Sequence, residues 1–260
     1  MSVMKIGVIG AGTMGNGIAH VFSLYKNDII LVDMNEEIID SALSTIHKNM
    51  ERQYRKDLIT EERMEKSYNN IIGTTNLEKL SDCNLVIEAV KEDYKIKSDL
   101  FQKLDKICNQ NTILASNTSS ISINDLAKNL SRSDKFIGMH FMNPVPVMKL
   151  VEIIKGDNTS KETLHSIKEL TKSIDKISVE CNDSPGFVSN RILMPMINEA
   201  VFCLMEGVAS AEAIDEIMKL GMAHPMGPLT LADLVGLDVC LSVCEVLHKD
   251  LGEDKYRPCP

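Results

Sequence analysis

The chain has 260 residues, of which 44% are hydrophobic and 25% are charged, a composition typical of an ordinary folded protein with one large or two modest domains. Its net charge of -9, its lack of Trp and its aromatic content of 4% argue against nucleic acid as the main partner. No apolar run approaches the length that crosses a bilayer, and the sequence enters a strand-like run at once, so we expect a cytoplasmic protein with no membrane partner.

The first two predicted elements enclose a glycine-rich turn. An apolar run ending at residue 9 predicts a buried strand, and the stretch 14–25 predicts a helix. Between them stand Gly10, Gly12, Thr13, Met14 and Gly15. The first glycine permits a tight bend, the second lets the backbone approach a pyrophosphate, and the third lets the helix pack on the strand. Because the helix N-terminus faces the negative charge, the pattern predicts dinucleotide binding.

The next strand-like run, 29–32, ends in an acidic residue that bears on cofactor choice. The carboxylate of Asp33 can accept both hydroxyls of an adenosine ribose. A 2′-phosphate there would be repelled by Asp33, and the following Met34, Asn35 and Glu36 offer no cation. We therefore expect NAD rather than NADP.

A helix is expected from Glu36 to Lys56. Its basic residues Lys48, Arg52, Arg55 and Lys56 fall along one side at helical spacing. They form either a local patch for an anionic substrate or an ordinary solvated helix face, and spacing alone leaves both open.

Strand-like runs recur along the first 183 residues, with helical stretches between most of them. They cover 6–9, 29–32, 85–89, 112–115, 136–139, 150–154 and 177–179. This alternation predicts an α/β fold with a doubly wound, mostly parallel sheet of the Rossmann type. Ligands of such sheets lie beyond the carboxyl ends of the strands, so the residues that follow each run are the candidates for chemistry.

His140 and Glu152 are the strongest catalytic candidates. His140 directly follows the run 136–139, where an imidazole could act as a general base on a substrate. Glu152 lies in the otherwise apolar run 150–154, where a carboxylate is costly unless it is paired. Each alone could be a satisfied core histidine or an edge-strand glutamate, but together they suggest a carboxylate that orients a catalytic imidazole.

Two further polar segments are candidates. Residues 116–120, Ser-Asn-Thr-Ser-Ser, follow the run 112–115 and offer hydroxyls and an amide where the nicotinamide end of a cofactor should lie. The alternative is a plain cap for a helix over 121–130. Asn190, near the start of a later helical stretch, could reach back across a cleft or be another polar helix residue.

The pattern becomes helical after Asp183, where a cluster of chain-breaking residues precedes expected helices over 192–205, 211–220 and 231–247. We expect an NAD-binding domain over 1–183 and a smaller all-helical domain over 184–260. Cys240, Cys244 and His248 share a helical stripe, but their apolar neighbours favour a buried helix face over a metal site. The seven scattered cysteines include no CxxC pair, so no metal is expected.

The whole chain closely resembles the L-3-hydroxyacyl-CoA dehydrogenase family, in particular its bacterial members that act on 3-hydroxybutyryl-CoA. The resemblance runs from Lys5 to Pro258. It rests on GAGTMG at 10–15, SNTSS at 116–120, GMHFMNPVPVMKLVEII at 138–154, DSPGFVSNRI at 183–192 and HPMGPLTLADLVGLD at 224–238.

The resemblance implies an NAD-dependent oxidoreductase that interconverts (S)-3-hydroxybutyryl-CoA and acetoacetyl-CoA by hydride transfer. It makes His140 the general acid and base and Glu152 its orienting partner. It assigns Ser119 and Asn190 to the substrate oxygens.

Cofactor and substrate binding are assigned in the same way. Glu92 and Lys97 match the family's cofactor-side residues, and Asn117 lies beside the nicotinamide. Arg52 and Lys56 fall where such enzymes hold the CoA moiety. A homodimer formed through the helical domain is also implied.

One departure from the family pattern concerns the C-terminal end. Relatives usually continue past the equivalent of Tyr256-Arg257-Pro258 into a glycine-rich, aromatic stretch, whereas this sequence stops at Pro260. Two other functions stay open at this point: a dehydrogenase of a hydroxy acid without CoA, such as L-gulonate, and an NAD-binding relative without catalysis.

Overall fold

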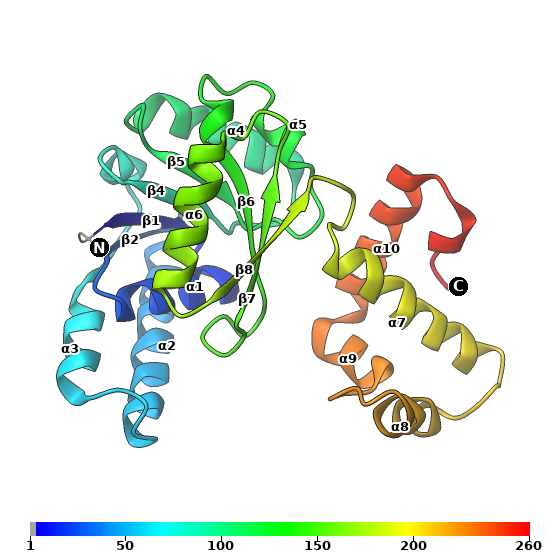
Figure 1. Ribbon diagram of the computed structural model, residues 1–260. Helices are drawn as coiled ribbons and strands as arrows, with labels where there is room; N and C mark the ends of the chain where they lie inside the picture. The colour runs from blue at the N-terminus through cyan, green and yellow to red at the C-terminus, as the bar shows by residue number, and fades with distance from the viewer. Residues whose placement is uncertain (1–3) are drawn as a thin grey trace. The chain divides into compact units, whose positions relative to one another are not determined.

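The computed structural model describes residues 4–260, which form two compact units, one ending at Asp183 and the other beginning at Ser184 (Figure 1). The first unit is built on an eight-stranded sheet in the order β3-β2-β1-β4-β5-β6-β7-β8. The strands are β1 (Lys5–Ile9), β2 (Asp28–Val32), β3 (Ile71–Thr74), β4 (Leu85–Glu88), β5 (Ile113–Ser116), β6 (Phe136–Phe141), β7 (Leu150–Lys155) and β8 (Ile177–Asn182).

The first six strands run parallel, as predicted. β7 runs antiparallel to β6, and β8 runs parallel to β7, so the last two strands oppose the rest. The carboxyl ends of β1, β4, β5 and β6 therefore meet the amino end of β7 at one edge of the sheet. The predicted mostly parallel, doubly wound sheet is confirmed.

Helices cover both faces of this sheet. They are α1 (Thr13–Leu24), α2 (Glu36–Arg55), α3 (Glu61–Asn69), α4 (Tyr94–Ile107), α5 (Ile123–Ala127) and α6 (Lys161–Ser173). α1, α2 and α6 share a continuous apolar core that contains Phe22, Met50 and Leu170. On the opposite face, Phe101 of α4 packs edge-on against Phe136 of β6, with ring centroids 4.7 Å apart.

The second unit consists of helices. It contains α7 (Ser189–Met205), α8 (Ala211–Gly221), α9 (Pro228–Val235) and α10 (Leu237–Leu251). Its own apolar core includes Met194, Ile197, Cys240, Cys244 and Leu247. Both cysteines of the predicted helical stripe are thus buried in apolar packing. No helix within residues 4–260 has the length and apolar character that crossing a membrane requires.

Three local expectations were wrong. The strand β3 was not predicted, because only its first two residues, Ile71 and Ile72, are apolar and Gly73 then ends the run. The helix expected over 121–130 extends only over Ile123–Ala127. The helix expected over 231–247 is two helices, since Gly236 adopts a φ of 101° between α9 and α10.

Candidate active site

The glycine-rich turn between β1 and α1 has the geometry that dinucleotide binding requires. Gly10 has a φ of 95°, which favours glycine, and its N–H donates to Val32 at 2.8 Å. A Cβ on Gly15 would overlap the carbonyl oxygen of Gly10, so this position needs glycine for close packing. A Cβ on Gly12 would meet no described atom within 4 Å. That open approach to the N-terminus of α1, where no side chain caps the helix, fits a pyrophosphate.

Asp33 lies at the end of β2 beside this turn. Its Oδ2 accepts a hydrogen bond from the N–H of Ala11 at 2.7 Å, and its Oδ1 accepts one from Met34 at 2.7 Å. Each carboxylate oxygen retains a lone pair that can accept a ribose hydroxyl. Glu36 and Glu37 follow in the first turn of α2, so the surroundings are acidic and disfavour a 2′-phosphate. These residues fit NAD.

A buried charge cluster occupies the ends of β4 and β5. Glu88, the last residue of β4, accepts hydrogen bonds from Lys97 of α4 and from Ser116 of β5, both at 2.6 Å. Glu88 and Lys97 are both fully buried, and burial raises the pKa of Glu88 against the opposing charge of Lys97. Glu88 was not assigned to the site from the sequence. The signal was present, because a carboxylate lies within the otherwise apolar run 85–89, as Glu152 lies within 150–154.

Glu92 joins Lys97 to the polar segment after β5. Its carboxylate lies 3.2 Å from the Lys97 ammonium and accepts hydrogen bonds from the Thr118 hydroxyl at 2.5 Å and the Ser119 N–H at 3.0 Å. Burial opposes ionisation, but the Lys97 charge and the Thr118 hydrogen bond outweigh it, so the pKa of Glu92 lies below its usual value. Glu92 therefore fixes the backbone of the segment that carries Ser119.

Asn117 connects the ends of three neighbouring strands. Its N–H donates to the carbonyl of Glu88 at 2.8 Å, and its side-chain oxygen accepts from the N–H of Phe141 at 2.9 Å. The structure thus brings Asn117, Ser119, Glu92 and Lys97 together at the carboxyl edge of the sheet.

His140 and Glu152 form a hydrogen-bonded pair. The antiparallel register of β6 and β7 places them directly opposite each other, and Nδ1 of His140 donates to Oε2 of Glu152 at 2.8 Å. The two residues are 8% and 5% exposed, so the pair is largely shielded from water. His140 lies within β6 rather than just after it, because the strand continues to Phe141. Two residues that the sequence placed in adjacent runs are in contact.

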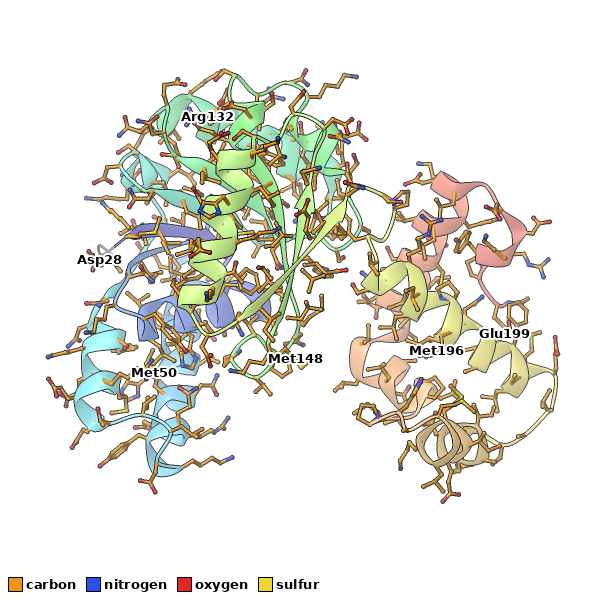
Figure 2. All side chains as sticks on the ribbon, viewed as in Figure 1. Asp28, Met50, Arg132, Met148, Met196 and Glu199 are labelled. Atoms are coloured by element: carbon orange, nitrogen blue, oxygen red, sulfur yellow. The ribbon has the colours of Figure 1, made fainter. Side chains whose placement is uncertain are left out.

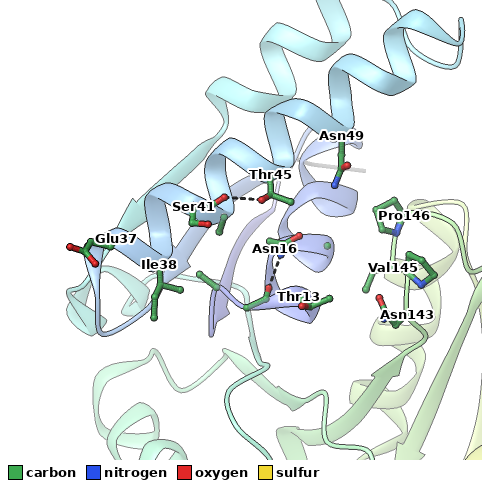
Figure 3. A pocket seen from close by; sticks show the side chains of 15 residues that line it. Thr13, Asn16, Glu37, Ile38, Ser41, Thr45, Asn49, Asn143, Val145 and Pro146 are labelled. Carbon is green, nitrogen blue, oxygen red and sulfur yellow. Dashed lines mark hydrogen bonds between the residues drawn. The ribbon is translucent and has the colours of Figure 1, made fainter. Parts of the chain in front are cut away.

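A pocket of about 550 Å³ lies between the turn, α2 and the β6–β7 loop (Figure 3). Gly12 and Thr13 line one end, the loop 143–146 forms one wall, and α2 contributes Ser41, Thr45 and Asn49. These α2 residues are spaced four apart, and Arg52 and Lys56 extend the same stripe by three and four residues. Arg52 donates to the side chain of Asn49 at 3.2 Å. The polar residues of this stripe were not predicted, although their spacing was visible.

Asn190 is the second residue of α7 and therefore belongs to the helical unit. The other candidate residues all belong to the first unit. The structure thus brings twelve of the fifteen predicted residues to one sheet edge and its adjoining turn, whereas Arg52 and Lys56 lie at the end of α2 and Asn190 lies in the helical unit.

A glycine turn that admits a pyrophosphate, an aspartate at the next strand end and a buried His–Glu pair at the same sheet edge define a Rossmann-type NAD-binding oxidoreductase. Residues 5–184 match the family model for the NAD-binding domain of 3-hydroxyacyl-CoA dehydrogenase, and residues 186–260 match its C-terminal domain. The chain belongs to the 3-hydroxyacyl-CoA dehydrogenase family.

Individual relatives agree with this assignment. A probable 3-hydroxybutyryl-CoA dehydrogenase of Deinococcus radiodurans is 54% identical over 99% of this chain and 92% of its own length. The crystal structure of an (S)-3-hydroxybutyryl-CoA dehydrogenase from Ralstonia eutropha matches with a TM-score of 0.95 at 46% identity, over 99% of this chain and 91% of that one. The human mitochondrial hydroxyacyl-coenzyme A dehydrogenase is 40% identical over 99% of this chain and 84% of its own length.

Proposed function

We propose that this protein interconverts (S)-3-hydroxybutyryl-CoA and acetoacetyl-CoA with NAD as the cofactor. The observation that carries the proposal is the 2.8 Å hydrogen bond between His140 and Glu152 at the edge where the dinucleotide turn lies. The names of the similar proteins support the choice of substrate.

His140 acts as the general acid and base in this mechanism. Because Nδ1 donates to Glu152, we assign proton exchange with the substrate oxygen to Nε2. In oxidation Nε2 takes the hydroxyl proton, and in reduction it returns a proton to the alkoxide. Glu152 stabilises the imidazolium and holds the ring in the required tautomer. When bound, the nicotinamide accepts or supplies the hydride.

The neighbouring polar residues position the reactants. Ser119 and Asn190 bind the C3 oxygen and the thioester carbonyl. Asn117, Glu92 and Lys97 shape the cofactor side of the site. The hydrogen bonds of Glu92 to Thr118 and Ser119 support this assignment, since they fix the segment beside the strand ends.

The CoA moiety occupies the pocket along α2. The polar stripe of Ser41, Thr45 and Asn49 lines it, and Arg52 and Lys56 continue this stripe beyond the pocket and add positive charge for phosphate. This local charge accommodates an anionic substrate on a chain whose net charge is -9.

The protein forms a homodimer through the helical unit and acts in the cytoplasm. Large exposed apolar side chains on α9 and α10, such as Leu234 and Leu237, support self-association. Seven free thiols, of which Cys83, Cys108, Cys240 and Cys244 are buried, suit a reducing compartment.

A spectrophotometric panel tests the proposal. Acetoacetyl-CoA, longer 3-ketoacyl-CoA substrates and free hydroxy acids such as L-gulonate are each offered with NADH or NAD, and with NADPH or NADP. We expect rapid NADH oxidation with acetoacetyl-CoA. Turnover of free hydroxy acids without turnover of any CoA thioester would overturn the substrate assignment, and no turnover at all would overturn the enzymatic one.

A further inference from the structure

Lys176 is a buried cation that no part of the proposed mechanism uses. It lies between α6 and β8 and is only 7% exposed. Its ammonium donates hydrogen bonds to the carbonyl oxygens of Val145 and Met148, both at 2.6 Å. Two carbonyls of the β6–β7 loop therefore converge on one charged donor, an arrangement that makes each hydrogen bond stronger than a neutral one.

The loop that Lys176 holds is a wall of the pocket described above. Asn143, Pro144, Val145 and Pro146 line that pocket (Figure 3), and Met148 lies where the loop returns to β7 (Figure 2). Within the loop, the N–H groups of residues 147 and 148 both donate to the carbonyl of Pro144 at 3.0 Å. The loop is thus folded on itself, and the hydrogen bonds of Lys176 attach its inner carbonyls to the rest of the first unit.

A second contact fixes the opposite side of the loop. Val145 is buried against α1, where a Cβ on Gly17 would lie 2.9 Å from the Cβ of Val145. The glycine admits the loop, and Lys176 holds the carbonyl of the same Val145 from the other side. The position of the pocket wall therefore depends on both contacts.

Lys176 forms no ion pair with a carboxylate among residues 4–260, although the charge of the neighbouring Asp175 acts on it. Asp175 is paired with the exposed Lys149 at 2.5 Å, and Tyr25 and Arg63 line the small cavity that Lys176 also borders. Burial, and then the charge of Lys149, lower the pKa of Lys176. An apolar side chain of similar length would fill this space without that cost, so the charge serves the two carbonyl hydrogen bonds.

We propose that Lys176 is a positioning residue for substrate affinity, holding the β6–β7 loop in the shape that receives the CoA arm. This inference rests on the proposed function, because it takes the pocket along α2 to be the CoA site. It assigns Lys176 to binding and leaves the proton transfer to His140.

Calorimetric titration with free CoA tests the inference without relying on turnover. Lys176→Met removes both hydrogen bonds at nearly constant length, and we expect the Kd for CoA to rise about tenfold. Lys176→Arg, which keeps donors at this point, should recover most of the affinity. Lys172→Met is the matched control, since it removes the same charge from an exposed position on α6 outside the β6–β7 loop, and its Kd should match that of the unaltered protein.

Kinetics separate positioning from general damage to the fold. With acetoacetyl-CoA and NADH, Lys176→Met should raise the KM of the thioester about tenfold and change kcat and the KM of NADH by less than about threefold. The KM of a short N-acetylcysteamine thioester, which lacks most of the CoA arm, should stay unchanged. If Lys176→Met does not fold, Lys176→Gln is held to the same criteria.

The outcomes distinguish this inference from the proposed function. CoA binding without turnover would overturn the proposed reaction, and the Kd values would still decide the role of Lys176. An unchanged Kd in the variant, or equal losses with the long and short thioesters, would overturn the role of Lys176. Failure of the unaltered protein to bind CoA would overturn both.

Discussion

His140 gains its proposed role from its contact with Glu152. Its imidazole donates through Nδ1 to Glu152 at 2.8 Å, and the strand ladder fixes both backbones. A carboxylate in this position favours one tautomer and stabilises the protonated ring, which a base needs at the moment it accepts a proton. The pair is therefore a proton-transfer device whose geometry is set before any substrate arrives.

Replacing His140 with Gln tests this device. The amide has similar size but cannot exchange a proton, so we expect kcat to fall by a factor of about 10² to 10⁴. Cofactor affinity should stay the same, because the dinucleotide turn is untouched. Steady-state kinetics and NADH fluorescence titration measure the two quantities, and near-normal kcat in the variant would remove His140 from the role of base.

Substitutions at two glycines of the turn should affect different properties, NADH affinity in one case and stability in the other. Gly12→Ala adds a Cβ into open space, so stability should change by less than about 0.5 kcal/mol, whereas the Kd for NADH should rise at least about tenfold because the methyl group obstructs the pyrophosphate. Gly15→Ala places its Cβ against the Gly10 carbonyl and should destabilise the fold itself. Urea unfolding and NADH titration of both variants check the pair. Unimpaired NADH binding by Gly12→Ala would contradict the proposed cofactor path.

At the scale of elements, α1 and α2 are joined by a buried histidine. His20 of α1 is 1% exposed and hydrogen-bonds through Nε2 to Gln53 of α2 at 3.0 Å, while its Nδ1 is buried without a partner among the described residues. Burial lowers the pKa of His20 from 6.5 to about 4. Protonation would place a charged N–H where no acceptor stands, so this helix contact favours the neutral ring.

The shift predicts acid sensitivity with a definite sign. Since the folded-state pKa lies below the unfolded one, the stabilisation is complete above pH 6.5 and is lost as the pH falls toward about 4. From pH 7 to pH 5 the unaltered protein should lose about 2 kcal/mol more than His20→Gln, whose amide does not titrate. Urea unfolding at both pH values measures the difference. Equal losses in the two proteins would contradict it.

Elements with a strong local pattern could be predicted, and those that depend on distant contacts could not. The glycines of the turn between β1 and α1 indicate its geometry. Glu152 indicates a partner, because a charged residue in an apolar run needs one. The apolar periodicity of the sequence does not indicate that the helix breaks at Gly236 or that β7 runs antiparallel to β6. The cluster around Glu88 also needs three elements that are distant in sequence, since Lys97 and Ser116 meet Glu88 only after folding.

At the scale of the whole molecule, an acidic protein must bind an anionic substrate. Arg52→Glu combined with Lys56→Glu reverses the local charge at the end of α2, and the KM for acetoacetyl-CoA should rise at least about tenfold at low salt. Salt should raise the KM of the unaltered protein more than that of the variant. Salt screens the attraction between the two basic side chains and the substrate phosphates, and the variant no longer has that attraction.

Lys66→Glu on α3 is the control for these charge reversals, since Lys66 pairs with Glu62 on that helix and does not line the pocket along α2. Its KM for acetoacetyl-CoA should stay near that of the unaltered protein. Equal effects of reversal at both places would point to the net charge of the molecule and contradict a local CoA site.

The helical unit makes a prediction about assembly. Leu234 and Leu237 are 70% and 60% exposed, and apolar side chains of this size are commonly covered by a partner. We expect a dimer in sedimentation velocity and a monomer for Leu234→Glu combined with Leu237→Glu. A monomeric unaltered protein would contradict the proposed assembly.

The antiparallel pairing of β7 with β6 places the catalytic pair in the strands and the substrate-facing wall in the loop between them, so the two can change separately in evolution. Because β6 and β7 are both buried, their packing in the core specifies the register that places His140 opposite Glu152. Insertions and deletions within residues 142–149 can therefore reshape the wall that faces the substrate while the proton-transfer pair keeps its alignment. Related proteins with this fold can therefore change substrate specificity through this short loop, provided that β6 and β7 keep their register.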